Sequence, residues 1–184
     1  MRIISGKYKG RSIRPPAGFK ARPTTDYARE SLFNILSVRY TFEDLSVLDL
    51  FSGTGSISYE FASRGTVHLD LVEINYRNFK FIEKTIGELN MDGIRAIHSN
   101  AKTYLRSCRN TYDIIFADPP YNLDWLEEIP DLIIDIDVLT ENGVIILEHS
   151  GTNSFIHHKH FIEHRKYGNV NFSFFSRNRK TSVP

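Results

Sequence analysis

The chain has 184 residues and a formal net charge of +1, and 41% of its residues are hydrophobic, which is ordinary for a soluble globular protein with one full core. Its single cysteine, Cys108, excludes an intramolecular disulfide and favours a reducing compartment. The sequence shows no long apolar run and no signal-peptide core, so we expect a cytoplasmic protein without a membrane span.

Charge is distributed unevenly along the chain. The first 40 residues hold nine Lys or Arg and two acidic residues, which gives a net charge of +7. The rest of the chain has a net charge of −6. A basic arm on a mildly acidic body is typical of a protein that binds a polyanion. The alternative is a solvated basic hairpin without a ligand.

The N-terminal segment predicts a small β-hairpin. Residues 2–5 and 11–14 have the pattern of short strands, and glycines border the turn at 6–10. Such a hairpin is too small to be stable alone, so we expect it to pack on the rest of the chain. Cations alternate with an aromatic ring here, which suits phosphate contact and base stacking: Lys7, Tyr8, Lys9 and Arg11.

A helix is predicted from about residue 26 to 38. Thr24, Thr25 or Asp26 can cap its N-terminus, and apolar residues recur at helical spacing from Ala28 to Leu36. Arg22 and Arg29 flank this start and can point towards a ligand. The alternative is that both are ordinary surface charges.

A strand, a glycine turn and a helix follow over residues 46–51, 52–56 and up to about 64. This combination lets a ligand approach the backbone closely. It also provides a helix N-terminus, which favours a negatively charged group of a ligand. The turn lacks the third glycine of a dinucleotide site, and it lacks the Gly-Lys-Ser/Thr of a P-loop.

The next strand, 67–72, ends at Glu73, which lies 24 residues after Asp49. An acidic residue at the tip of the second strand can bind both hydroxyls of a ribose. A helix over 75–89 and a strand over 94–98 follow, and Asn100 comes just after that strand, where a side chain can meet the edge of an adenine. Together these segments predict half of a nucleoside-binding sheet.

Asp118-Pro119-Pro120-Tyr121 follows a buried strand over 112–117, after a short helix over 102–109. Two prolines cannot continue the strand, so a carboxylate, a rigid turn and an aromatic ring are held where ligands bind in α/β sheets. A carboxylate and a backbone carbonyl can accept both hydrogens of a nucleobase amine, and the ring can stack on an unstacked base. The pattern indicates methylation of such an amine, and the alternative is a tight turn with Tyr121 in the core.

The C-terminal part predicts an acidic helix over 125–136, interrupted at Pro130, a strand over 144–148, and a hairpin of 160–166 and 169–175. We interpret a cluster of histidines as solvated: His157, His158 and His160. No cysteine or nearby carboxylate completes a plausible set of metal ligands with them. The tail from Arg177 is expected to fray.

This order of elements resembles the Rossmann-like class I methyltransferase fold, an α/β fold whose seven-stranded, mostly parallel sheet has an antiparallel last strand. Residues 49–55 resemble its S-adenosylmethionine motif, Glu73 matches its ribose-binding acid, and residues 118–121 match its amino-methyltransferase signature. Three segments make the resemblance specific to one family within this fold. Residues 2–11, 22–36 and 166–168 are similar to the bacterial 16S ribosomal RNA guanine-N(2)-methyltransferases, the RsmD family. Two residues depart from the pattern: Tyr27, where that family has a basic residue, and Asn100, where many methyltransferases have Asp.

The resemblance implies S-adenosylmethionine-dependent methylation of the N(2) amine of a specific guanine in 16S ribosomal RNA, within a small-subunit particle. Separately, we expect a monomer, and the proposed chemistry needs no metal. The resemblance also implies a hairpin extension over residues 1–22 and a methyltransferase domain over 23–184. The implied catalytic residues are Asp118, Pro119, Pro120 and Tyr121. The implied cofactor residues are Asp49, Phe51, Ser52, Gly53, Thr54, Gly55, Glu73, Ile74, Asn100 and Ala101. The implied RNA contacts are Lys7, Tyr8, Lys9, Arg11, Arg22, Thr24 and Arg29.

Two other functions fit parts of the pattern. An adenine-N(6) amino-methyltransferase acting on DNA has the same core, but such enzymes often carry an added target-recognition domain. A catalytically silent RNA-binding module would not need an intact Asp118-Pro119-Pro120-Tyr121 together with Glu73.

Overall fold

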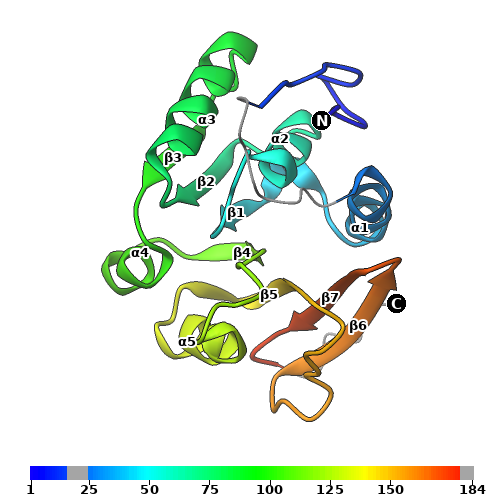
Figure 1. Cartoon of the computed structure of the whole chain (residues 1–184), viewed down its shortest axis with the longest axis vertical. Coiled ribbons are helices and arrows are strands. Elements are labelled where there is room, and N and C mark those ends of the chain that lie inside the picture. The colour runs from blue at the N-terminus through cyan, green and yellow to red at the C-terminus, as the bar shows by residue number, and fades with distance from the viewer. Residues whose placement is uncertain (16–24, 179–184) are drawn as a thin grey trace.

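The computed structural model describes residues 1–15 and 25–178, and its centre is one seven-stranded sheet (Figure 1). The strand order is β3-β2-β1-β4-β5-β7-β6; the first five strands in this order are parallel, and β7 lies antiparallel between β5 and β6. This arrangement confirms the predicted fold class. The strands are β1 (Ser46–Asp49), β2 (His68–Glu73), β3 (Ile94–His98), β4 (Tyr112–Ala117), β5 (Leu139–His149), β6 (Phe161–Tyr167) and β7 (Val170–Phe175).

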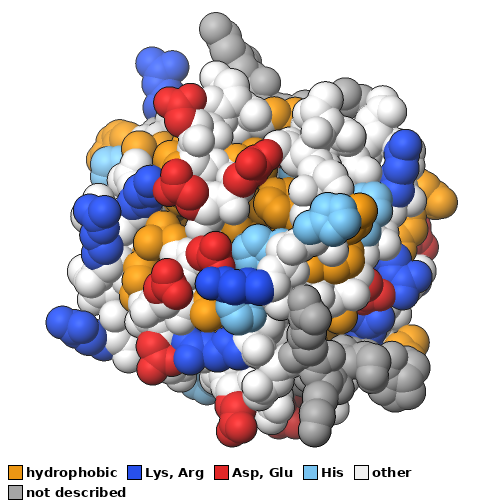
Figure 2. Space-filling model, turned by 90° about the horizontal axis from the view of Figure 1, so that it is seen from below, with side chains coloured by type: hydrophobic (Ala, Val, Ile, Leu, Met, Phe, Trp, Pro, Cys, Tyr) orange, Lys and Arg blue, Asp and Glu red, His pale blue; other side chains and the backbone are white. Residues whose placement is uncertain are grey.

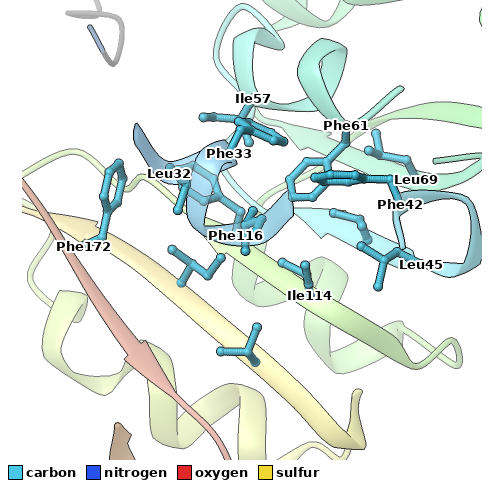
Figure 3. Packing of buried hydrophobic residues seen from close by; sticks show 14 of the residues in the cluster. Leu32, Phe33, Phe42, Leu45, Ile57, Phe61, Leu69, Ile114, Phe116 and Phe172 are labelled. Atoms are coloured by element: carbon cyan, nitrogen blue, oxygen red, sulfur yellow. The ribbon is translucent and has the colours of Figure 1, made fainter. Parts of the chain in front are cut away.

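Helices cover both faces of the sheet. One apolar cluster joins the sheet to α1 (Asp26–Arg39), α2 (Ser56–Ser63) and α3 (Tyr76–Leu89). The other joins it to α4 (Ala101–Ser107) and α5 (Ile129–Asp135). Figure 3 shows the first cluster, where aromatic rings of α1 and α2 pack against side chains of β4. In the described parts of the chain, no helix is long and apolar enough to span a membrane.

Three C-terminal predictions need correction. Strand β5 begins at Leu139 rather than at residue 144, because Leu139 pairs with Tyr112 before the register shifts. Pro130 does not interrupt a helix; it lies in the first turn of α5, where a missing N–H is harmless. His158 is not solvated, because its ring packs edge-on to Phe175 at a centroid distance of 5.1 Å.

The N-terminal arm, residues 1–15, packs on the rest of the chain, as predicted, and the element it meets is α2, while the strands predicted over 2–5 and 11–14 shrink to a minimal hairpin. A single antiparallel bridge joins Arg2 to Ser12, and Ile3 and Ile13 are buried against Tyr59 of α2. At Gly6, where φ is +80°, an added Cβ would lie 1.8 Å from the carbonyl oxygen of Ser63. Only glycine allows this approach, so the arm docks through backbone contact. The predicted boundary at residue 22 lies outside the described residues.

Arg29 differs from its prediction as an RNA contact, because its side chain is only 1% exposed. Its Nη2 donates to the carbonyl of Arg2 and to Asp26, at 2.7 and 2.9 Å. Its Nε lies 3.5 Å from Oε1 of Glu60, which also accepts from the backbone N–H of Ile4. Arg29 therefore joins α1, α2 and the arm and does not present its charge to a polyanion.

Substitution of Arg29 by Ala is expected to destabilise the protein by about 3 kcal/mol, because it breaks a buried ion pair and leaves its partners unsatisfied. Urea unfolding measures this free energy. Glu30→Ala is the matched control, since Glu30 is an exposed residue of the same helix and its removal should cost less than about 1 kcal/mol. Equal losses in the two variants would contradict the structural role of Arg29.

Candidate active site

A cavity lies at the C-terminal ends of β1, β2 and β4. Its volume of about 640 Å³ is typical of small-molecule sites. It brings together segments that are far apart in the sequence. All the predicted catalytic residues and all the predicted cofactor residues except Gly55 line it. The residues that line it are Asp49, Leu50, Phe51, Ser52, Gly53, Thr54, Ser56, Ile57, Val72, Glu73, Ile74, Asn78, Ser99, Asn100, Ala101, Phe116, Asp118, Pro119, Pro120, Tyr121, Leu123 and Trp125.

The glycine turn between β1 and α2 presents bare backbone to this cavity. Gly53 and Gly55 have φ values of 56° and 81°, in the left-handed region that favours glycine. An added Cβ at Gly55 would lie 2.7 Å from Cζ of Tyr59, whose ring fills the space beneath the turn. Gly55 therefore shapes the turn from just behind the cavity wall.

Glu73 ties the glycine turn to the end of β2. Its Oε2 accepts from the N–H of Gly53 at 2.8 Å, and its Oε1 accepts from the N–H of Asn75 at 2.6 Å. Burial raises the pKa of this carboxyl. The side chain of Asn78 also donates to this carboxyl. The two carboxylate oxygens have four lone pairs in all, so the group keeps acceptor capacity for a hydroxyl of a ligand.

Asp49 contributes a buried acceptor to the cavity wall. Its Oδ2 accepts from the hydroxyl of Ser58 at 2.6 Å, while its Oδ1 is buried without a hydrogen-bond partner in the described structure. Burial raises the pKa of this carboxyl to about 7. A buried oxygen without a donor is costly, so this wall suits a ligand that brings an N–H or a positive charge.

Asn100 is the N-cap of α4, which fixes its side-chain orientation. Its Oδ1 accepts from the N–H of Lys102 at 2.9 Å and from that of Thr103 at 3.4 Å. Because the oxygen is used by the helix, the amide NH₂ is the group that remains to face a ligand. Asn100 can therefore donate to a ring nitrogen, whereas an Asp at this position would accept.

The Asp118-Pro119-Pro120-Tyr121 segment leaves the end of β4 as a turn, in which the N–H of Leu123 donates to the carbonyl of Pro120 at 2.9 Å. Tyr121 is 52% exposed, so it does not belong to the core. Burial and the negative charges of Glu148 and Asp49 hold the pKa of Asp118 well above its usual range. The segment supplies a carboxyl, a fixed carbonyl and an open aromatic side chain on one side of the cavity.

One wall of the cavity does not follow from the sequence patterns. The ring of Trp125 lies 5.9 Å from that of Phe51, and Nζ of Lys102 lies 4.3 Å from the centre of the indole ring. Leu123 and Asn78 also line the cavity without having been predicted. The sequence predicts Trp125 as the start of a helix, and only the turn after Tyr121 brings it back over the site.

Among the predicted RNA contacts, Lys7, Lys9 and Arg11 are exposed on the arm. Tyr8 is half-buried: its ring packs against the arm's apolar cluster and its hydroxyl donates to the carbonyl of Asn90 at 3.2 Å, so it also anchors the arm. Arg22 and Thr24 lie outside the described residues. Figure 2 shows the side of the molecule away from the arm, where the visible acidic, basic and histidine side chains are intermixed.

Known relatives match most of the chain. Residues 1–176 match the family described as Conserved hypothetical protein 95. Ribosomal RNA small subunit methyltransferase D of Buchnera aphidicola subsp. Baizongia pistaciae is 34% identical over 83% of this chain and 77% of its own length. The protein of the same name from Escherichia coli K12 is 33% identical over 80% of this chain and 74% of its own length.

Solved structures share the fold. The Escherichia coli protein yhhF has a TM-score of 0.83 and 29% identity, with 97% of this chain and 98% of that chain covered. SMU.776, whose crystal structure is complexed with SAH, has a TM-score of 0.65 and 19% identity, covering 80% of this chain and 49% of that one, and this likeness shows the fold alone. The chain belongs to the family described as Conserved hypothetical protein 95, the RsmD family of bacterial ribosomal RNA methyltransferases.

Proposed function

We propose that the protein transfers a methyl group from S-adenosylmethionine to the exocyclic N(2) amine of a guanine in 16S ribosomal RNA. The observation that carries this proposal is that Glu73 with the glycine turn and the Asp118-Pro119-Pro120-Tyr121 segment line one cavity. The names of the relatives support ribosomal RNA as the substrate. The resemblance to the RsmD family supports guanine as the base.

The residues present fit this cofactor. Oδ1 of Asp49 offers an acceptor without a donor, suited to the amino group of the methionine part, and the Gly53 turn lets that part lie on bare backbone. Glu73 would accept from the ribose hydroxyls, and Asn100 would donate to a ring nitrogen of the adenine. Phe51, Ser52 and Thr54 would line the methionine end, and Ile74 and Ala101 would flank the adenine. When bound, S-adenosylmethionine supplies a methyl group on a positively charged sulfur.

The chain's own groups position the target base. Asp118 and the carbonyl of Pro119 would accept the amine hydrogens, which aims the nitrogen lone pair towards the methyl group. Tyr121 would stack on the displaced base. These roles are mainly positioning and electrostatic stabilisation, which suit an amine whose lone pair is conjugated into the ring.

The arm would hold the RNA backbone. Residues 1–15 contain five exposed cations and no acidic residue, so the arm attracts phosphates: Arg2, Lys7, Lys9, Arg11 and Arg14. A surface this small can touch only a short stretch of RNA. We therefore propose that a monomer of this protein acts on a small-subunit particle, whose shape adds a binding surface that naked RNA lacks.

The first test measures transfer of labelled methyl groups to protein-free ribosomal RNA, to unmodified small subunits and to duplex DNA. We expect methylguanosine from the subunits, and methyladenine from DNA would instead support the adenine-N(6) alternative.

Asp118→Ala should lower the rate on subunits by about 100- to 1,000-fold, because the acceptor for the amine is removed. Asp124→Ala, an exposed acid of the same loop, is the control and should leave the rate unchanged.

Trp125 gives a direct test of cofactor binding, because it is the only tryptophan of the chain and lies in the cavity wall. We expect S-adenosylhomocysteine to change its fluorescence in a saturable way. Glu73→Gln should weaken this binding by about tenfold or more, since the ribose no longer has a charged acceptor. Glu83→Gln, an exposed change on α3, should have no effect, and equal weakening in both variants would contradict the role of Glu73.

The arm is tested through salt dependence. Replacing Lys7, Lys9 and Arg11 together by Gln should weaken binding to small-subunit RNA and reduce the slope of log affinity against log salt by about 2, because each phosphate that a cation neutralises adds roughly 0.7 to 0.9 to that slope. A triple change of scattered exposed cations, Lys84, Arg109 and Arg165, is the control. If the slope falls equally in both triple variants, the arm has no special part in RNA binding.

A further inference from the structure

We propose that the ring of Tyr27, held by Tyr167, stacks on an unpaired base of the RNA close to the target guanine. Tyr27 lies in the first turn of α1, at the position where the RsmD family has a basic residue. This inference rests on the proposed function and adds a base contact to its RNA surface.

Tyr27 presents an aromatic ring to solvent. Its exposed fraction is 64%, which is high for a large hydrophobic side chain in this structure. The ring is nearly perpendicular to that of Tyr167, at an interplanar angle of 82° and a centroid distance of 6.0 Å. Whichever ring points its edge at the other, a perpendicular contact covers at most one face of Tyr27. The contact with Tyr167 therefore leaves ring surface on which a base can lie.

Tyr167 gives this contact a rigid support. It is the last residue of β6, and it pairs with Val170 of β7 across a two-residue turn in which Gly168 has a φ of 62°. Its ring lies 6.2 Å from the buried ring of Phe172. A side chain that is already held in place loses less freedom when a ligand binds to it, so this support favours stacking on Tyr27.

The strand register places the tyrosine pair at the same edge of the sheet as the candidate active site. Through the pairs that link β4, β5, β7 and β6, Ala117 at the end of β4 lies level with His164 of β6. Strand β6 runs in the same direction as β4 and continues for three residues to Tyr167. Three strand spacings separate β4 from β6, or about 14 Å, a distance that a short stretch of unpaired RNA can span.

Basic side chains lie on both sides of the pair. Helix α1 begins between the arm and the β6–β7 hairpin, because Arg29 donates to the carbonyl of Arg2 while Tyr27 contacts Tyr167 (Figure 1). Arg2 on the arm and Lys166 on the hairpin are both exposed. Proteins bind single-stranded nucleic acid with this combination, in which cations meet the phosphates and an aromatic ring takes a base.

The acidic side chains near the pair do little to oppose this binding. Asp26 is paired with Arg29, and Glu163 is paired with arginines of α1 and β6. Glu30, one turn further along α1, is exposed. Among the described residues of this region, the exposed cations therefore outweigh the acid that has no arginine beside it, and the local charge favours an anionic partner.

The test measures affinity for protein-free small-subunit RNA over a range of salt concentrations. Tyr27→Ala should weaken binding by about tenfold, because one stack between a base and an aromatic ring is lost. The slope of log affinity against log salt should stay at its wild-type value, since no charge changes. Tyr27→Phe keeps the ring and should bind like the wild type. A loss in Tyr27→Phe as large as that in Tyr27→Ala would contradict stacking.

Tyr27→Lys tests whether this position faces the RNA at all. A lysine here should meet a phosphate in place of a base, and the slope of log affinity against log salt should steepen by about 0.7 to 0.9. A slope equal to that of the wild type would show that residue 27 lies away from the RNA, and it would overturn the inference.

Val38→Ala is the matched control, because Val38 is 83% exposed at the other end of α1, and it should change neither affinity nor slope. The fluorescence titration of Trp125 with S-adenosylhomocysteine should be the same in every variant. A common fall in cofactor binding would show that Tyr27 supports the fold and would contradict a contact made only with RNA.

The same variants on small subunits separate the possible partners. If Tyr27→Ala weakens binding to subunits but not to protein-free RNA, Tyr27 contacts a ribosomal protein and the inference is wrong. If Tyr27→Ala binds both as tightly as the wild type does, while the wild type methylates subunits, the inference is wrong although the proposed function stands. If the wild-type protein makes no methylguanosine, the proposed function itself fails.

Discussion

Negative charge gathered at one edge of a parallel sheet is the constraint on which the rest of this structure depends. Parallel strands end at the same edge, so acidic residues that follow them lie close together and repel each other. The chain offsets part of this cost with fixed donors: the backbone N–H groups of Gly53 and Asn75 on Glu73, and the hydroxyl of Ser58 on Asp49. The apolar clusters on both faces of the sheet supply stability that compensates for the remaining repulsion between these carboxylates.

Helix α2 connects the two functional parts of the molecule. It begins at the glycine turn, where Tyr59 supports Gly55, and it ends beneath the arm, where Glu60 and Ser63 hold Ile4 and Lys7 by hydrogen bonds. Because one rigid helix of eight residues makes both sets of contacts, the position of the arm is fixed relative to the glycine turn. The basic residues that would bind RNA therefore have a defined direction relative to Asp118.

Most of the sheet and of the cavity wall could be predicted from the sequence, because those features depend on local patterns. Strands β3 and β4 have the predicted bounds, and the glycine turn, Glu73 and the Asp118 segment meet as parallel strands require. The prediction for Arg29 is wrong because a cation near the N-terminus looks the same in sequence whether it is exposed or packed against a distant helix. Trp125 escapes prediction because only the path of a turn places it over the site.

The docking of the arm through Gly6 has an evolutionary consequence. The closest approach there is between the Gly6 backbone and the backbone of Ser63, and the N–H of Lys7 donates to that same carbonyl at 2.6 Å. Neither interaction uses the Lys7 side chain. Descendants of this chain can therefore exchange the charged side chains of the arm, while the arm keeps its place as long as residue 6 stays glycine.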